Sequence, residues 1–191
     1  MNMFYKKHPK GTYEYTLYKR KVDIIITVVL FALALGLYIT GKVATGSNRN
    51  LLTIVAVLGL LPACKMVVDV IMCFKAKPCD MDIKASIDNV VGKLTGLYNM
   101  YFTSYDKNFS IDHLVITDGS IIGYSSDKKF VEKDYITHMN DLLRKDGLKD
   151  IHIKVFDDKN KYLSRLEELN KLENVSNTNM NVLNLILNVT L

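Results

Sequence analysis

Two long runs of apolar residues lie in the N-terminal part of the chain. Residues 24–40 form a run of 17 residues with no charged side chain, and residues 51–74 contain only Lys65 and Asp69 as charges. At about 1.5 Å per helical residue, the first run spans most of a hydrocarbon layer roughly 30 Å thick, and the second run is longer. Because a short polar segment joins the runs, the pattern predicts an antiparallel transmembrane hairpin with helices over about 22–40 and 51–74.

A cleaved signal peptide is the alternative interpretation of the first run. Signal peptides have a short charged region before the apolar stretch and a cleavage site of small residues after it. Here 23 residues precede the run, no convincing small-x-small site follows it, and a second apolar run comes soon afterwards. These features favour a permanent membrane segment.

Basic residues flank the hairpin unevenly. Residues 1–22 contain six Lys or Arg, and three lysines follow the second run within residues 75–84, whereas the connecting loop has only Lys42 and Arg49. Basic residues near membrane ends accumulate on the cytoplasmic side. We therefore expect a multi-pass protein of the plasma membrane with its N- and C-termini in the cytoplasm.

The remainder of the chain predicts a small α+β domain. Apolar spacings of three and four residues predict helices, and β-rich or alternating runs predict strands. The order is αββαβαβ, with a mixed sheet of about four strands. The predicted elements are a helix over 81–104, strands over 110–117 and 120–124, a helix from Ser126 or Asp127 to about 146, a strand over 151–156, a helix from Asp157 or Asp158, and a strand over 183–191.

Local signals mark several of these element ends. Asp80 is suited to capping the first helix of the domain, and Gly147 is suited to ending the second. The dipeptide Asp118-Gly119 between two β-rich runs is typical of a type I′ hairpin turn. The domain organisation that follows is a cytoplasmic basic arm over 1–21, the hairpin over 22–76 and the α+β domain over 77–191.

Charge distribution and cysteine spacing argue against nucleic-acid binding and against a zinc or disulfide site. Of the net charge of +5, residues 1–75 carry +7 and residues 76–191 carry −2, so the domain lacks the basic surface that nucleic-acid binding requires. Cys64, Cys73 and Cys79 show no CxxC or His/Cys spacing. We therefore expect no nucleic-acid partner, no disulfide framework, no metal and no cofactor.

The catalytic candidates are few and weak. His113 and His152 fall in predicted strands and could meet across a sheet, with Asp112 beside His113. The predicted core superficially resembles that of nucleases in which an aspartate and a later Glu-x-Lys on adjacent strands hold a metal ion. Asp112 fits the first position, but residues 120–124 supply neither carboxylate nor lysine. Strand histidines held by hydrogen bonds are the simpler interpretation.

Two Ser/Asp clusters lie at predicted element ends. Ser104-Tyr105-Asp106 and Tyr124-Ser125-Ser126-Asp127 suit capping and turn formation. The alternative is one polar binding pocket built by both clusters, which makes Ser125 and Asp127 weak site candidates. The sequence contains no GxSxG, P-loop or GxGxxG motif.

Lys65 and Asp69 are four residues apart in the second apolar run, so they share a helical face and can pair. A lysine near a membrane end extends its ammonium group to the headgroups, which predicts an interfacial pair. An ion pair held within the membrane would instead indicate a functional site. Both interpretations stay open.

Four segments carry a resemblance to a known group of proteins. With these segments the chain resembles an uncharacterised family of two-transmembrane-helix membrane proteins of clostridial-type bacteria, some of which bear an automated O-linked GlcNAc transferase-like label. The resemblance implies a topology and a bacterial setting. The residues do not support a transferase, because the domain is too short and has no phosphate-binding loop. The segments are Pro9-Lys10-Gly11-Thr12, residues 59–65, residues 103–106 and residues 124–127.

We expect a membrane-anchored cytoplasmic domain that serves as a non-catalytic binding or scaffolding module. Its partners would be the lipid bilayer and either another protein or a second copy of the chain. One alternative is a small membrane-tethered hydrolase with a degenerate nuclease-like core, using Asp112 and a strand histidine. Another is an accessory subunit of a membrane transporter complex, in which Lys65 or Asp69 would support assembly.

Overall fold

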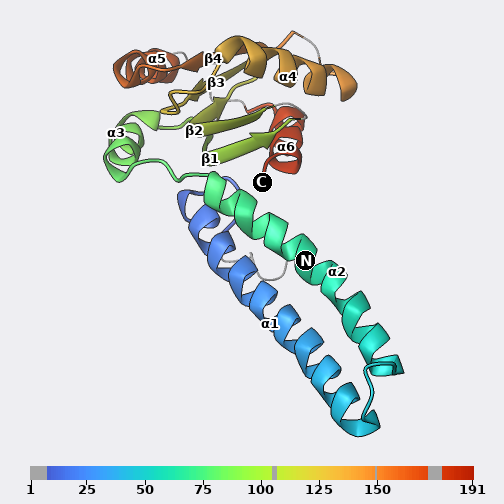
Figure 1. Ribbon diagram of the computed structural model, residues 1–191. Helices are drawn as coiled ribbons and strands as arrows, with labels where there is room; N and C mark the ends of the chain where they lie inside the picture. Colours follow the sequence, from blue (N-terminus) through green and yellow to red (C-terminus); the bar gives the residue numbers. More distant parts are fainter. Residues whose placement is uncertain (1–7, 105–106, 149, 172–177) are drawn as a thin grey trace. The chain divides into compact units, whose positions relative to one another are not determined.

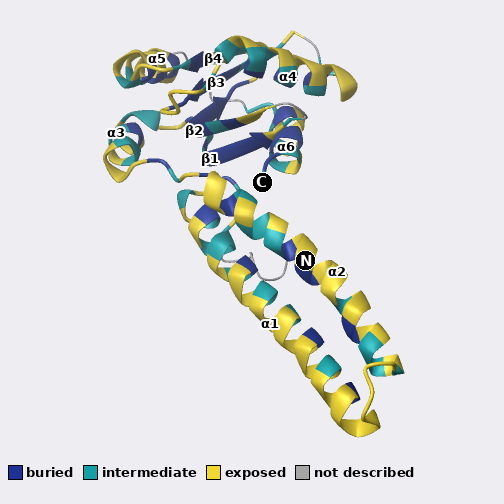
Figure 2. Ribbon diagram, viewed as in Figure 1, coloured by how far each residue is buried: buried dark blue, intermediate teal, exposed yellow. Residues whose placement is uncertain are grey.

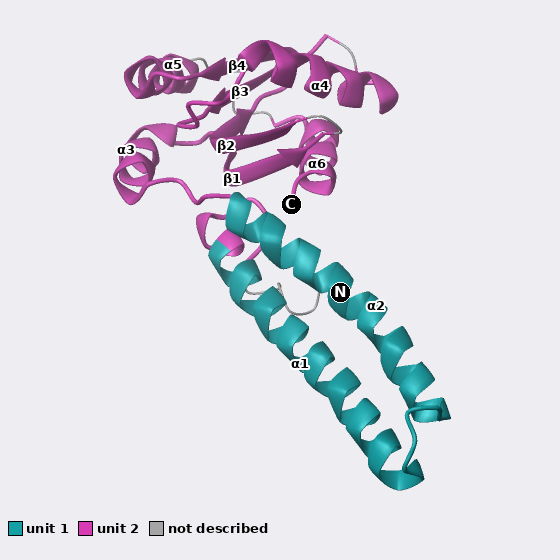
Figure 3. Ribbon diagram, in the orientation of Figure 1, with its two compact units in different colours: residues 1–7, 17–75 teal, residues 8–16, 76–191 magenta. Residues whose placement is uncertain are grey.

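A computed structural model describes residues 8–104, 107–148, 150–171 and 178–191. The chain divides into a helical unit, which includes residues 17–75, and an α+β unit of residues 8–16 and 76–191 (Figure 3). The predicted α+β class is confirmed, since two long apolar helices precede a domain with a four-stranded mixed sheet (Figure 1).

The helical unit consists of most of α1 (Tyr13–Thr45) and all of α2 (Leu51–Lys75). Both helices are long and apolar enough to cross a membrane. The Asn50 side chain caps α2 by accepting a hydrogen bond of 2.8 Å from the Thr53 amide. At Gly41 an added Cβ would lie 2.8 Å from the Leu52 Cβ, so the absence of a side chain lets the two helices meet closely near the loop.

The α+β unit is built on a sheet with the strand order β1-β2-β3-β4. The first three strands are antiparallel neighbours, and β4 runs parallel to β3 after a crossover through α4. Parallel neighbours require such a crossover. The elements are α3 (Met81–Val91), β1 (Gly96–Thr103), β2 (Asn108–Ile116), β3 (Ser120–Tyr124), α4 (Glu132–Lys145), β4 (His152–Phe156), α5 (Lys159–Lys171) and α6 (Met180–Val189).

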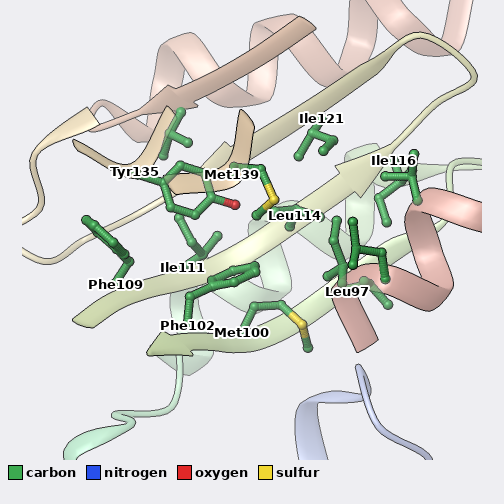
Figure 4. Packing of buried hydrophobic residues seen from close by; sticks show 14 of the residues in the cluster. Leu97, Met100, Phe102, Phe109, Ile111, Leu114, Ile116, Ile121, Tyr135 and Met139 are labelled. Carbon is green, nitrogen blue, oxygen red and sulfur yellow. The ribbon is translucent and has the colours of Figure 1, made fainter. Parts of the chain in front are cut away.

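Helices cover both faces of this sheet, and the sheet itself is mostly buried (Figure 2). On one face, α4 and α6 pack with the strands around an aromatic group in which the Tyr135 ring lies 5.3 Å from Phe102 and 5.6 Å from Phe109 (Figure 4). On the other face, α3 and α5 enclose a smaller cluster that includes Val115 and Leu166. Burial on both faces explains why the strands read as nearly continuous apolar runs.

The first predicted helix of the domain is wrong beyond residue 91. Gly92 has a left-handed φ of 55° and ends α3, and residues 96–103 form β1. The residues Leu94, Leu97 and Tyr101 have helical spacing, but pairing of β1 with β2 from Gly96 to Thr103 overrides it. This strand replaces the one predicted at the C-terminus, so the strand number holds while the order changes to αβββαβαα.

The C-terminal strand prediction is also wrong, because residues 180–189 form α6. Asn179 accepts hydrogen bonds from the amides of Asn181 and Val182 and so starts the helix. Val182, Leu185 and Ile186 share the buried face at spacings of three and four, which the run of alternating leucines also allows.

Two predicted local details differ from the structure. Helix α4 begins at Glu132, not at Ser126 or Asp127, because Asp127 closes a turn by accepting from the Phe130 amide at 2.9 Å. The hairpin between β2 and β3 is confirmed, but neither Asp118 nor Gly119 adopts the left-handed backbone of a type I′ turn. The Thr117 hydroxyl binds Ser120 and helps to close that turn.

Candidate functional site

A buried polar cluster lies on the sheet face that α3 and α5 cover. His113 of β2 is fully buried, and its Nδ1 shares a hydrogen bond of 2.6 Å with the Tyr162 hydroxyl of α5. The Tyr98 ring of β1 lies 4.4 Å from the imidazole, centroid to centroid. Gly96 makes room for the imidazole of His113, since a Cβ at position 96 would lie 2.3 Å from its Nε2. The imidazole is therefore packed between strands and helix and does not face solvent.

Burial fixes the protonation states in this cluster. Desolvation lowers the pKa of His113 to about 3, against a weak opposing effect of the Asp88 carboxylate. Desolvation likewise raises the pKa of Tyr162 well above its usual value. Nε2 of His113 has no hydrogen-bond partner among the described residues. Near neutral pH the imidazole is therefore neutral.

Asp112 and Ser125 are engaged in the chain segment that follows β3. The Asp112 carboxylate accepts a hydrogen bond of 2.5 Å from the Ser126 amide. Burial raises the pKa of Asp112, and the hydrogen bonding with Ser126 opposes that rise. The Ser125 hydroxyl donates to the Ser110 carbonyl at 2.7 Å. Both buried side chains thus satisfy local backbone groups, as turn chemistry requires.

Asp127 completes this turn at the surface. Its amide donates to the Ser125 hydroxyl at 3.3 Å, and its carboxylate accepts from the Lys129 amide at 2.9 Å. These bonds join the end of β3 to the turn before α4. Asp127 therefore acts as a turn residue in this arrangement.

The sheet lacks the ligand set that a nuclease-type metal site requires. Asp112 lies in β2, and the neighbouring strand β3 carries neither carboxylate nor lysine. Within residues 8–104, 107–148, 150–171 and 178–191, no three His, Cys, Asp or Glu side chains gather as metal ligands would. A divalent cation would find one carboxylate here, already bound to an amide hydrogen.

His113 and His152 do not meet across the sheet. His152 pairs with Ser120 at the start of β3, whereas His113 pairs with Tyr124 at its end. Four residues of extended strand correspond to about 13 Å. His152 is exposed and lines a hollow of about 390 Å³ beside the end of α4, together with Arg144 and Asp150.

A second hollow of about 370 Å³ lies against α4 and includes Ser104, Lys107 and His138. The Lys107 ammonium pairs with the Asp134 carboxylate, and the His138 ring stacks on Phe109 with centroids 5.8 Å apart. This hollow contains neither Ser125 nor Asp127. Tyr105 and Asp106, predicted as part of a polar cluster, lie outside the described residues.

Asn99 is a central residue that sequence reasoning missed. It has a left-handed φ of 56° in β1, and its Oδ1 accepts from the Cys79 amide at 2.7 Å. Its Nδ2 donates to the Tyr13 carbonyl at 2.9 Å. One amide therefore links the start of α1 with the segment that follows α2. An asparagine inside a run of strand-forming residues was the available signal, because Asn tolerates the left-handed region better than most residues.

The Cys79 thiol beside this amide is buried and chemically inert. Burial raises its pKa to about 12, and the nearby Asp112 and Asp80 carboxylates add to the effect. The thiolate is the nucleophilic form of cysteine. Because that form is strongly disfavoured here, Cys79 does not serve as a nucleophile near neutral pH.

Two ion pairs occur among the described residues of the helical unit, 17–75. Lys65 and Asp69 pair at 2.9 Å along α2, with the Lys65 side chain 66% exposed. Lys19 and Asp23 form a second pair at 2.7 Å, which sequence reasoning missed. Asp23 is buried, and the Cys73 sulfur of α2 lies 3.6 Å from both the ammonium and the carboxylate. This buried polar contact joins α1 to α2.

Comparisons of the chain with protein-family models, curated proteins and solved structures find no match. The resemblance to two-helix membrane proteins of clostridial-type bacteria thus stays a prediction. The function must be argued from the residues of this chain.

Proposed function

We propose that this chain is a bacterial inner-membrane protein whose helical hairpin anchors a cytoplasmic, non-catalytic binding or scaffolding domain. The observation that carries the proposal is the exposure of apolar side chains along both long helices. Each helix contains an 18-residue stretch that is its most apolar part. Only 11% of that stretch in α1 and 17% of it in α2 is buried within the protein. Helices of a soluble core would be mostly buried.

The exposed apolar surface of the two long helices favours a bilayer over water as their surroundings. Within residues 17–74, 21 large apolar side chains are exposed, among them Ile25, Leu33 and Leu61 at 60% or more. Even about 1 kcal/mol of transfer free energy per side chain gives on the order of 20 kcal/mol for the hairpin. A bilayer supplies the missing burial.

The packing of the chain around Asn99 supports a cytoplasmic location for both ends. Residues 8–16 and 76–191 form one unit, in which Asn99 binds both Tyr13 and Cys79. Segments held by one amide lie on one side of the membrane, which is consistent with two crossings. The six basic residues before the hairpin, against two in its loop, favour the cytoplasm for that side.

The protonation and hydrogen bonding of the candidate catalytic side chains favour a non-catalytic role. His113 is buried and neutral, Asp112 and Ser125 bind backbone groups, and the Cys79 thiol stays protonated. Catalysis requires a nucleophile or acid–base group that a substrate can reach. These residues instead stabilise the sheet and its turns.

Membrane extraction and cross-linking of the full chain test this proposal. We expect the chain to stay in the membrane fraction after alkaline carbonate washing and to leave it only with detergent. Cross-linking in intact membranes should capture the same partner for the native chain and for Asp112→Asn, since that residue has no catalytic task. A carbonate-soluble chain contradicts the membrane anchor. Turnover of phosphodiester or nucleotide-sugar substrates that Asp112→Asn abolishes contradicts the non-catalytic role.

A further inference from the structure

An apolar groove of about 320 Å³ lies between α1 and α2. Ala34 and Ala56, both nearly fully buried, are among its lining residues, and Phe31, Leu35 and Leu60 contribute larger side chains. The small alanines create the hollow because their side chains end at Cβ. Among the lining residues, Tyr38 alone carries a polar side-chain atom.

A second hollow lies at the start of α2, beside the loop that joins the two helices. The Tyr38 hydroxyl donates to the Asn48 side chain at 3.4 Å, and Asn48 and Arg49 line a hollow of about 480 Å³ at the start of α2. Within the described part of the chain, the Arg49 guanidinium has no acidic or hydrogen-bonding partner. Its position next to the positive end of the α2 dipole favours an anion. The Tyr38–Asn48 hydrogen bond thus connects a residue that lines the apolar groove with a residue that lines the hollow beside Arg49.

The depth of the groove corresponds to one leaflet of a bilayer. Leu60 lies nine residues from Leu51 along α2, a rise of about 13.5 Å, and half of the hydrocarbon layer is roughly 15 Å. The two hollows therefore extend from the headgroup level on the loop side to about the midplane. A phospholipid places its phosphate and one acyl chain over the same distance.

The volume of the groove favours a hydrocarbon chain over a helix. A methylene group occupies about as much space as a water molecule, roughly 30 Å³, so 320 Å³ holds about ten carbons. A helix of about 10 Å diameter would need roughly 800 Å³ over the rise from Phe31 to Tyr38. A helix from a second copy does not fit into this groove.

We propose that the hairpin binds a phospholipid of the loop-side leaflet, with one acyl chain in the groove and its phosphate on Arg49. This inference rests on the proposed membrane location of the hairpin. The phosphate is assigned to Arg49 because this residue is the cation next to Asn48, whose side chain binds Tyr38 at the loop end of the groove.

Photo-labelling with a lipid tests the site on the full chain. The probe is phosphatidylglycerol with a diazirine in the distal half of one acyl chain, mixed into phosphatidylcholine vesicles that contain the reconstituted protein. Mass spectrometry of peptides locates the adducts. We expect labelling at Phe31 and Leu60 to exceed labelling at Leu33 and Leu61 at least threefold. The latter two lie at the same depths but outside the groove.

Two variants with matched controls test the groove and the Arg49 end of the site separately. Ala56→Phe fills the groove and should lower labelling of Leu60 at least threefold, whereas Val68→Phe, on an exposed part of α2, should not. Arg49→Gln should also lower it, whereas Lys75→Gln at the other end of α2 should not. Arg49 is at the surface, so its replacement tests the site even if Ala56→Phe disturbs helix packing.

Three results would overturn the proposal. Equal labelling of groove and non-groove residues would show contact with bulk lipid only. A cross-link between two protein copies at Phe31 or Leu60 would show that a second chain occupies this face. Labelling that neither Ala56→Phe nor Arg49→Gln reduces would exclude the assigned site. Adducts absent from all of residues 17–75 would instead refute the membrane location itself.

Discussion

Replacing His113 with glutamine should remove a large part of the acid sensitivity of the α+β unit. In the folded chain the pKa of His113 is about 3, whereas an unfolded histidine titrates near 6.5. Between these values the unfolded state binds one more proton than the folded state, so stability falls as the pH falls. Glutamine does not titrate, and its side chain still offers an acceptor to the Tyr162 hydroxyl.

The size of the effect follows from one proton. Each pH unit below about 6.5 costs the native chain roughly 1.4 kcal/mol through His113, which gives about 2 kcal/mol at pH 5. Asp112 acts in the opposite direction, because its raised pKa lets the folded state take up a proton before the unfolded state does. Since Asp112 is present in both proteins, their difference isolates His113.

Thermal unfolding of the full chain in a non-ionic detergent, followed by the near-ultraviolet circular dichroism of its tyrosines, measures this difference. Between pH 7 and pH 5, the native chain should lose roughly 8 °C more in Tm than His113→Gln, at about 4 °C per kcal/mol for a domain of this size. Equal losses in both proteins would refute the reasoning, because the imidazole would then be protonated or open to water in the folded state.

Three further substitutions test the packing around this cluster and the ends of the hairpin. Gly96→Ala should destabilise the α+β unit by about 1–3 kcal/mol through the clash of its Cβ with the imidazole, and thermal unfolding in a His113→Ala background should show that cost relieved. Asn99→Ala should cost about 1–3 kcal/mol and speed hydrogen exchange of the Cys79 amide, whereas Asn99→Gly should restore part of the stability because glycine tolerates the left-handed backbone. Asp80→Ala should cost about 1 kcal/mol by removing the cap of α3, with faster exchange confined to the first turn of that helix; unchanged exchange there would contradict the capping role.

The hairpin and the β2–β3 pair could be predicted because each depends on local pattern. Residues 24–40 have no charged side chain, and residues 51–74 have only Lys65 and Asp69. The runs on either side of Asp118-Gly119 can pair with each other without distant partners. The helix caps at Asp80 and Asp158 are likewise short-range, and both are present. Local sequence patterns, which involve residues close together in the chain, were therefore enough to predict these elements.

The errors came from segments whose apolar spacing fits two structures. The apolar spacing of residues 96–103 is compatible with a helix or a strand, and these residues form a strand because they pair with β2. The apolar spacing of residues 180–189 is compatible with a strand or a helix. These residues form a helix, whose apolar face packs on the sheet in the same cluster as α4. Tertiary contacts override local propensity in both cases.

The candidate residues were visible in the sequence, but their roles were not. Asp112 and His113 are adjacent, yet the partners that fix them, Ser126 and Tyr162, lie 14 and 49 residues away. Adjacency raised a catalytic pair only as an alternative to a strand histidine held by hydrogen bonds, and His113 makes such a bond with Tyr162. Such roles depend on contacts that no single-sequence pattern encodes.

The location of the loop between α1 and α2 tests the central claim most directly. An enzyme reporter that is active only outside the cytoplasm can be inserted after Ser47, and a reporter that is active only in the cytoplasm can be fused after Leu191. The account predicts activity from both fusions, since the hairpin crosses the membrane twice and the domain stays inside. Inactivity of the Ser47 insertion in a stably produced protein, or export of the Leu191 fusion, would contradict it.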